Sequence, residues 1–364
     1  MNVERLHRVL IDLKNDLQIE KTVALLLSVN NNLQKQVNQP NQPTHQSNLA
    51  KSLKDLYKSL ENSAYNTYPP GWKAVITQIS QGTNLGIELK NEIENVITSN
   101  KIVPTIAHEQ IKTIYNNLSR FMTGIGSTLT GLEILGIENE ELDDGQCELG
   151  YSIPREYVDN KLSALKKEIN ELNFILDHIT EAILGEKLEY KVKTISSSDF
   201  ILYVIIGLQV ADVLSKALER MLTHYKTILE IRELRNKLNE KGVPESKTKS
   251  VESHVNGMMV EEIRAIAKDV IEEHYEEKNP RKNELENGLI IALNKLANRI
   301  DQGFKVEVRV QSLPEPEEEE ETNNEYEKTK AIIDSIKAHA QNIDFIETKG
   351  ESILKLTENI EKKD

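Results

Sequence analysis

The sequence predicts a mainly α-helical protein with long helices, a coiled-coil-like helix pair over 154–184 and 198–241, and a small three-stranded β-sheet. Apolar residues recur at helical spacing over long segments, which is typical of amphipathic helices. Three short stretches instead alternate apolar and polar residues, which is typical of strands. The 364 residues are 38% hydrophobic and only 5% aromatic, a composition that suits helices burying a single stripe.

Residues 1–140 are predicted to form an N-terminal helical domain. Helical periodicity runs through 4–36, 49–64 and 72–99. A polar, proline-containing stretch separates the first two segments and predicts a loop. Gly82 and Gly86 weaken the third segment by about 1 kcal/mol each relative to alanine, which indicates a kink or a close helix contact.

Proline and glycine bracket three further helical segments, 104–136, 154–185 and 280–303. Proline is tolerated in the first turn of a helix, where its missing N–H has no partner, and glycine suits the left-handed residue after the last turn. Gly242 and Pro244 end the segment 198–241 in the same way, and another helix is predicted over 251–277. These brackets therefore predict where the helices begin and end.

The segment 154–184 carries a heptad seam of eight aliphatic residues, Val158, Leu162, Leu165, Ile169, Leu172, Leu176, Ile179 and Ile183. Leaving such a seam exposed to water would cost about 1.5–3 kcal/mol of stability per side chain. The segment 198–241 is predicted to be a single helix with its own stripe, so the two segments are expected to pack together. Pairing of each seam with a second copy of the chain is the alternative that the sequence leaves open.

The three alternating stretches are 146–153, 188–195 and 304–310. An isolated strand is not stable in water, so the three are expected to meet in one sheet. Such a sheet would bring residue 304 close to residue 150 and make 141–311 one helical core with a small sheet. Residues 312–323 are rich in proline and glutamate and predict an extended linker. Residues 324–364 predict a helical tail, which either folds back or reaches a partner.

Charge and cysteine content exclude several classes of protein. The net charge is −14, and the closest candidates for a basic patch, Lys166–Lys167 and Arg232–Lys237, have acidic neighbours. A nucleic-acid partner is therefore not expected. The single cysteine, Cys147, excludes an intramolecular disulfide. The residues after Met1 lack the pattern of a signal peptide, so the sequence indicates a cytoplasmic, bacterial protein.

Motifs for catalysis, cofactors and metals are missing from the sequence, and no residue is predicted to serve any of these roles. The glycine-rich stretch Gly124–Gly131 has the wrong spacing for a phosphate loop, and we interpret it as small residues that permit close helix packing. A di-iron bundle requires two Glu-x-x-His pairs, and only His7 has a glutamate, Glu4, three residues before it. The carboxylate and histidine cluster 272–277 is interpreted as a solvated helix face, and Cys147 as a buried small hydrophobe.

The apolar stretch Phe200–Ala211 raises the question of a membrane. It is expected to be helical, but it is far shorter than the roughly 20 residues that span a bilayer. Asp199 and Asp212 flank it, and carboxylates are costly in hydrocarbon. A buried core helix is therefore favoured, and contact with a membrane remains the less favoured alternative.

The sequence favours a non-enzymatic interaction or scaffold protein with a protein partner or self-association. One alternative is a membrane-acting effector of a bacterial defence or toxin-associated system that exposes helix 200–211. Another is an enzyme with an unrecognised site that includes His224, Tyr225 and the cluster 272–277. No cofactor is expected. The residues predicted to mediate interaction are Leu165, Leu172, Ile179, Leu214, Leu218, Met221, Ile332, Ile336 and Ile343.

Overall fold

A computed structural model describes residues 2–196, 200–275, 280–314, 324–344, 352 and 354–358, without the side chains of 245–252. Of the residues that the structure describes, 70% are helical, and they form eleven α-helices, one short 3-10 helix and one small four-stranded antiparallel sheet. The predicted fold class, mainly α with a small sheet, is thus confirmed. The chain divides into two compact units, 1–141 and 142–364.

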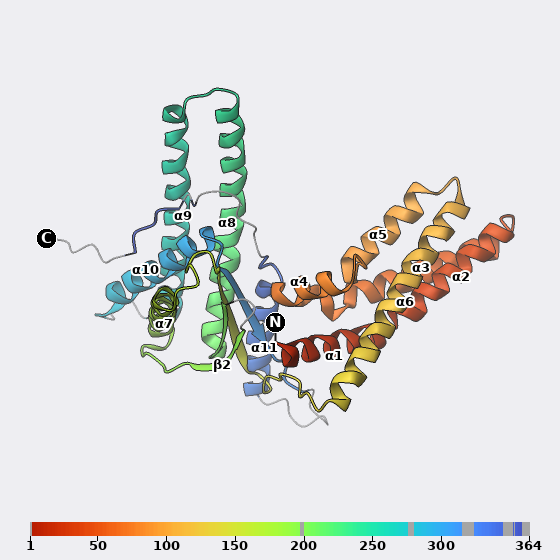
Figure 1. Ribbon diagram of the computed structural model, residues 1–364, viewed down its shortest axis with the longest axis horizontal. Helices are drawn as coiled ribbons and strands as arrows, with labels where there is room; N and C mark the ends of the chain where they lie inside the picture. The colour runs from red at the N-terminus through yellow and green to blue at the C-terminus, as the bar shows by residue number, and fades with distance from the viewer. Residues whose placement is uncertain are drawn as a thin grey trace. The chain divides into compact units, whose positions relative to one another are not determined.

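The first unit is a bundle of helices around one apolar core (Figure 1). Helix α2 packs on α3 and α6, while α5 packs on α3 and α6 in turn. The elements are α1 (Val3–Ile19), α2 (Thr22–Asn38), α3 (Pro43–Asn62), the 3-10 helix η1 (Ala64–Thr67), α4 (Pro70–Ile79), α5 (Gly86–Ser99) and α6 (Pro104–Ile134).

Two segments that were expected to be single helices are each divided in the structure. The segment 4–36 breaks into α1 and α2 at Lys21, which adopts a left-handed conformation with φ 54°. The segment 72–99 breaks into α4 and α5 around Gly82, whose φ is 85°. The apolar spacing continues across both breaks, so periodicity alone does not reveal them.

An ion pair fixes the residues after α6 against α1. The Arg5 side chain is only 2% exposed, and it donates from Nε and Nη2 to the Glu140 carboxylate at 3.0 and 2.9 Å. Two parallel hydrogen bonds of this kind combine charge with a fixed geometry. This ion pair therefore connects the first helix of the first unit to the residues at the end of that unit.

The sheet of the second unit has the strand order β2-β3-β1-β4, and all neighbouring strands are antiparallel. Its strands are β1 (Cys147–Ile153), β2 (Lys191–Ser196), β3 (Phe200–Ile206) and β4 (Lys305–Val310). Gly150 lies opposite Glu307 on β4 and opposite Tyr203 on β3. The predicted meeting of residues 150 and 304–310 is therefore observed.

The prediction of one helix over 198–241 is wrong, and so is the apolar helix 200–211. Phe200–Ile206 is strand β3, and helix α8 (Leu208–Glu240) begins only after Gly207. A short continuous apolar run is equally compatible with a buried strand and a buried helix. Here β1 and β2 lie on either side of the run and bond to its backbone, so the predicted three-stranded sheet has four strands.

Helix α7 (Leu162–Leu184) packs chiefly against α10 (Lys282–Asp301), and less against α9 (Glu245–His274) and α8. The expected pairing of α7 with α8 is therefore not the main contact. A Cβ atom at Gly288 would lie 2.8 Å from the His178 ring, so glycine permits the close approach of α7 and α10. Helices α8 and α9 run side by side as a hairpin that extends beyond the sheet (Figure 1).

The heptad seam of α7 is buried only in part. Leu172, Leu176, Ile179 and Ile183 lie in the core, whereas Leu162 is 81% exposed and Ile169 is 39% exposed. Pro154 does not open the helix, because residues 155–160 form turns and α7 begins at Leu162. Gly185, with φ 79°, ends α7 as predicted.

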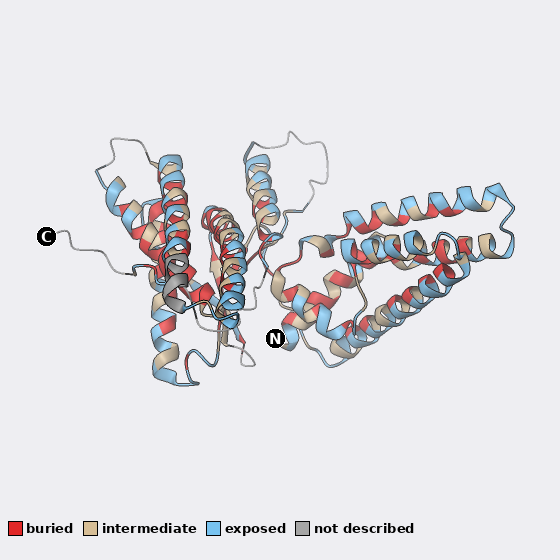
Figure 2. Ribbon diagram, turned by 90° about the horizontal axis from the view of Figure 1, so that it is seen from above, coloured by how far each residue is buried: buried red, intermediate tan, exposed pale blue. Residues whose placement is uncertain are grey.

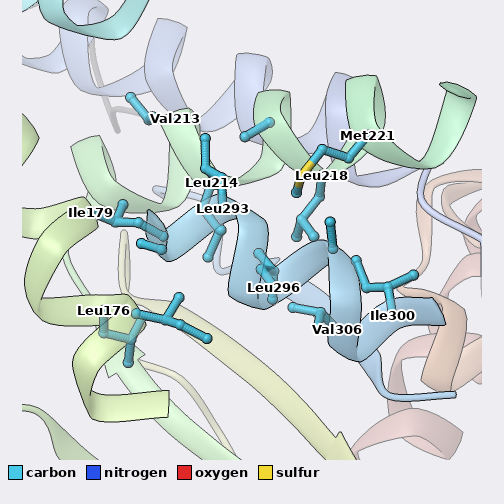
Figure 3. Packing of buried hydrophobic residues seen from close by; sticks show 14 of the residues in the cluster. Leu176, Ile179, Val213, Leu214, Leu218, Met221, Leu293, Leu296, Ile300 and Val306 are labelled. Carbon is cyan, nitrogen blue, oxygen red and sulfur yellow. The ribbon is translucent and has the colours of Figure 1, made fainter. Parts of the chain in front are cut away.

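Helix α10 lies at the centre of the second unit. Every residue from Ile291 to Asp301 is buried, so this part of the helix has no exposed face. Figure 3 shows Leu293, Leu296 and Ile300 of α10 among apolar residues of α7, α8 and β4. On most other helices buried residues occupy one side and exposed residues the other (Figure 2).

The C-terminal region folds back onto the second unit. Helix α11 (Asn324–Ala340) packs against α8 and β4. The helix expected to continue to about residue 360 ends at Ala340, and residues 354–358 have no regular secondary structure. Residues 315–323 of the predicted acidic linker lie outside the described residues.

The partial burial of the seam generates a stability prediction. Leu176→Ala is expected to lower the free energy of unfolding by about 2–5 kcal/mol, because it removes a core side chain. Leu162→Ala, in the same seam, is expected to change it by no more than about 0.5 kcal/mol. Urea denaturation followed by circular dichroism measures both. Equal losses would mean that the whole seam is covered in solution.

Candidate functional site

The nine residues predicted to mediate interaction all lie in the core of the second unit. Leu165 and Ile332 are partly buried at its edge. The others are buried, namely Leu172, Ile179, Leu214, Leu218, Met221, Ile336 and Ile343. Side chains of α7, α8, α9 and α10 converge there (Figure 3). These residues therefore contact other parts of the same chain.

A different set of residues forms a site on α10. The second half of this helix carries Asn294, Lys295, Asn298, Arg299 and Asp301, each of them less than a tenth exposed. Residues of this kind are rarely buried without hydrogen-bond or ionic partners. Their partners come from α7 and from the extended segment 354–358, which lies along α9 and α10. We call this site, formed by those five residues and Asn256, the α9–α10 groove.

Side chains of the groove bind the backbone of consecutive residues in the segment. The N–H groups of Leu354 and Lys355 donate to Asp301 Oδ2 at 2.7 Å and to Asn256 Oδ1 at 2.9 Å. Asn294 Nδ2 donates to the Thr357 carbonyl at 2.8 Å. These are contacts to main-chain atoms, so they do not depend on which side chains the segment carries.

Asn298 makes the most complete contact. Its Oδ1 accepts from the Leu356 N–H at 3.1 Å, and its Nδ2 donates to the carbonyl of the same residue at 3.0 Å. The Nδ2 group also donates to Glu358 Oε1 at 2.7 Å. An amide side chain has two donor hydrogens, and Asn298 uses both on the segment.

The segment adds alternating side-chain contacts. Leu354 and Leu356 are buried, whereas Lys355 and Thr357 are exposed. Ordering the backbone costs about 1–2 kcal/mol per residue. Burial stabilises the docked segment by about 1.5–3 kcal/mol for each leucine, and each hydrogen bond contributes about 0.5–1.5 kcal/mol. These opposing terms are similar in size, so docking of the segment is marginal.

An ionic cluster closes one end of the groove. Lys295 Nζ lies 2.8 Å from Glu171 Oε2, and Arg299 Nε lies 2.8 Å from Glu168 Oε2, both on α7. Glu358 of the segment joins them, with Oε2 at 3.4 Å from Lys295 Nζ and 3.8 Å from Arg299 Nη1. Glu358 is thus the third carboxylate beside these two cations, and its shortest polar contact is with the Asn298 amide.

The other end of the groove is fixed by α8. Asp301 Oδ1 accepts a hydrogen bond from the Tyr225 hydroxyl while Oδ2 binds the Leu354 N–H. Burial and the Asp301 carboxylate raise the pKa of Tyr225 well above its usual value, so the phenol stays protonated and donates. Asp301 is thereby held in a defined orientation.

Sequence reasoning missed this groove because polar residues on a helix usually face solvent. One signal was present. Asn294, Asn298 and Asp301 are interleaved with Leu293, Leu296 and Ile300, so the helix is apolar on one side and rich in short amide and carboxylate groups on the other. Short polar side chains are less typical of a solvated helix face than lysine and glutamate.

The residues considered for an enzyme site do not come together. His224 Nε2 lies 3.1 Å from Glu262 on α9, whereas the neighbouring Tyr225 points into the core toward Asp301. Of the cluster 272–277, residues 276 and 277 lie outside the described residues. Among the residues that the structure describes, no group of histidine, cysteine and acidic side chains is arranged to hold a metal ion.

The interpretation of Gly124–Gly131 as a close helix contact is wrong. A Cβ atom built at Gly124, Gly126 or Gly131 would meet no other atom within 4 Å. Gly124 instead lines an open pocket of about 530 Å³ in the first unit, together with Arg120 and Phe121. The small residues leave space there rather than bringing helices together.

Two further findings bear on function. No described helix has both the length and the apolar character needed to cross a bilayer. Comparison of the chain with protein-family models, with curated proteins and with solved structures gave no match.

The burial of Cys147 generates a prediction about reactivity. Its side chain is 1% exposed, and burial, with a smaller contribution from Asp212, raises the pKa of its thiol to about 12. We expect negligible labelling by a disulfide reagent at pH 8 and rapid labelling in denaturant. Between pH about 8.5 and about 12 the unfolded chain releases this proton and the folded chain keeps it, so this residue's contribution to stability falls as pH rises. Rapid native labelling would contradict the burial.

The contacts of Asn298 generate a second prediction. Asn298→Ala removes its hydrogen bonds to Leu356 and Glu358, a loss of about 1–3 kcal/mol for the docked segment. Hydrogen exchange at residues 354–358 is expected to accelerate roughly tenfold or more, as 1.4 kcal/mol corresponds to a factor of ten. Asn287→Ala, at an exposed position of the same helix, is the control. Unchanged exchange in Asn298→Ala would show that the segment does not depend on the groove.

Proposed function

We propose that the protein is a non-enzymatic interaction scaffold that binds another protein. The observation that carries this proposal is the α9–α10 groove, in which buried amide and carboxylate side chains bind the main chain of an extended segment. Recognition of peptides in extended form uses main-chain hydrogen bonds for affinity and pockets for alternate side chains for specificity. A cytoplasmic location and a bacterial source, as the sequence indicates, are part of the proposal.

The chemistry of the groove supports binding rather than catalysis. Asn294, Asn298 and Asp301 are all engaged with backbone atoms or with Tyr225. A catalytic site needs a nucleophile or base with a positioned partner. The candidates considered for that role, His224 and Cys147, lie respectively beside Glu262 and in the core.

The two alternative functions have less support. The membrane-acting effector was inferred from an apolar helix over 200–211, and Phe200–Ile206 is instead a strand bonded on both edges. The enzyme with an unrecognised site was inferred from residue types that lie apart. No specific observation favours either of these over the scaffold.

The proposal predicts a defined assembly. Full-length protein is immobilised and incubated with extract of its source cells, and captured proteins are identified by mass spectrometry. We expect a partner in near-equal amounts, and a complex larger than the 41.4 kDa chain in size-exclusion chromatography with light scattering. Beads carrying urea-unfolded protein are the control. A chain that stays monomeric and captures nothing beyond the control would contradict the proposal.

A further inference from the structure

The segment 354–358 is held in the way a bound peptide is held. It belongs to no sheet or helix, and its main-chain groups bond to side chains of α9 and α10. Elements of the core bond mainly within themselves or along a strand partner. The segment therefore resembles a ligand that is joined to its receptor by the chain.

We propose that the α9–α10 groove is a binding site for an extended segment of another protein, and that residues 354–358 occupy it as an internal competitor. The segment defines the chemistry of that ligand: aliphatic residues at its first and third positions and a carboxylate at its fifth. This inference rests on the proposed function and names the class of partner.

The groove selects each part of this pattern through a separate contact. Buried space takes the side chains of Leu354 and Leu356, while Lys355 and Thr357 between them are exposed and unselected. Lys295, Asn298 and Arg299 together surround the Glu358 carboxylate. A partner segment needs only these three side chains, because its main chain supplies the rest.

The floor of the groove also suits an occupant that leaves. The groups that bond to the main chain of the segment are amide and carboxylate side chains, which water can solvate when the segment departs. The apolar contacts of Leu354 and Leu356 with the core are lost in the same step and have to be replaced by those of the incoming ligand. Asn294 Oδ1 is buried and has no hydrogen-bond partner among the residues that the structure describes. It offers a further acceptor for a main-chain N–H of a better-fitting ligand.

Internal competition gives the groove a regulatory property. A tethered segment acts at an effective concentration in the millimolar range for short flexible connections. A free ligand must therefore compete with residues 354–358. Its apparent affinity equals its intrinsic affinity multiplied by the fraction of molecules whose groove is open. Weakening the internal segment is expected to tighten binding of the external one.

The test uses fluorescence anisotropy with a labelled synthetic peptide that has the sequence of residues 352–362. The full-length chain is compared with a full-length Leu354→Asp/Leu356→Asp variant, in which the internal segment is weakened. We expect this variant to bind the peptide at least roughly tenfold more tightly than wild type. Leu354→Ala/Leu356→Ala is a milder second variant, and circular dichroism confirms that each variant is folded.

Two matched pairs locate the binding. In the weakened background, Asn298→Ala is expected to reduce peptide affinity at least roughly tenfold, whereas Asn287→Ala leaves it unchanged. A peptide carrying Leu356→Asp is expected not to bind, whereas one carrying Lys355→Ala binds as the parent does. Failure of the weakened chain to bind, or equal effects of the two asparagine substitutions, would overturn the inference.

Two other results separate the possible occupants and proposals. Light scattering of wild type and Asn298→Ala tests whether a second copy supplies the segment, and a dimer that depends on Asn298 would overturn the assignment to a different protein. Capture of a stoichiometric partner together with no peptide binding would leave the scaffold function standing and remove only this inference. The opposite result, in which the peptide binds as described, supports it.

Discussion

The second unit depends on one constraint, which is that Ile291–Asp301 of α10 is buried on all sides although its last two turns carry amide and charged groups. Buried polar groups are costly unless they are hydrogen-bonded or paired. Glu168 and Glu171 of α7 pair with Arg299 and Lys295, and the main chain of 354–358 bonds to the amide groups of Asn294 and Asn298. The burial of these polar groups therefore depends on elements that are far apart in the sequence.

In the function that we propose, this arrangement joins stability to recognition. The contacts that hold the C-terminal segment would then also hold a ligand, and they are directed at main-chain atoms, at two leucine side chains and at one carboxylate. Because docking of a short extended segment gains little more than its ordering costs, the proposal expects the occupant to exchange without unfolding of the core. The apolar side of α10, which includes Leu293 and Leu296, stays packed against α7 and α8 throughout.

The small sheet provides the frame for this helix. Strand β4 follows α10 after a short turn at Gly303 and pairs with β1, which places α10 across the apolar side formed by Leu149, Tyr151 and Val306. Gly150 is needed at the centre of β1, because a Cβ atom there would lie 2.8 Å from Glu307 and 3.0 Å from Tyr203. The register of β1 with β3 and β4 therefore depends on glycine at position 150.

Local chemistry by itself determined the helical class, the ends of α7 and α10 at Gly185 and Gly303, and the strands at 147–153 and 305–310. Those features follow from the periodicity of apolar residues and from the backbone preferences of single residues. Both depend only on residues that are close together in the sequence. Only the tertiary structure decided that Phe200–Ile206 is a strand, that α7 packs chiefly on α10, and that the polar side of α10 is a buried groove. A short apolar run becomes a strand where neighbouring strands can hydrogen-bond to its backbone. A polar helix face is solvated unless another segment covers it. Each of these outcomes therefore depends on contacts between residues that are distant in the chain.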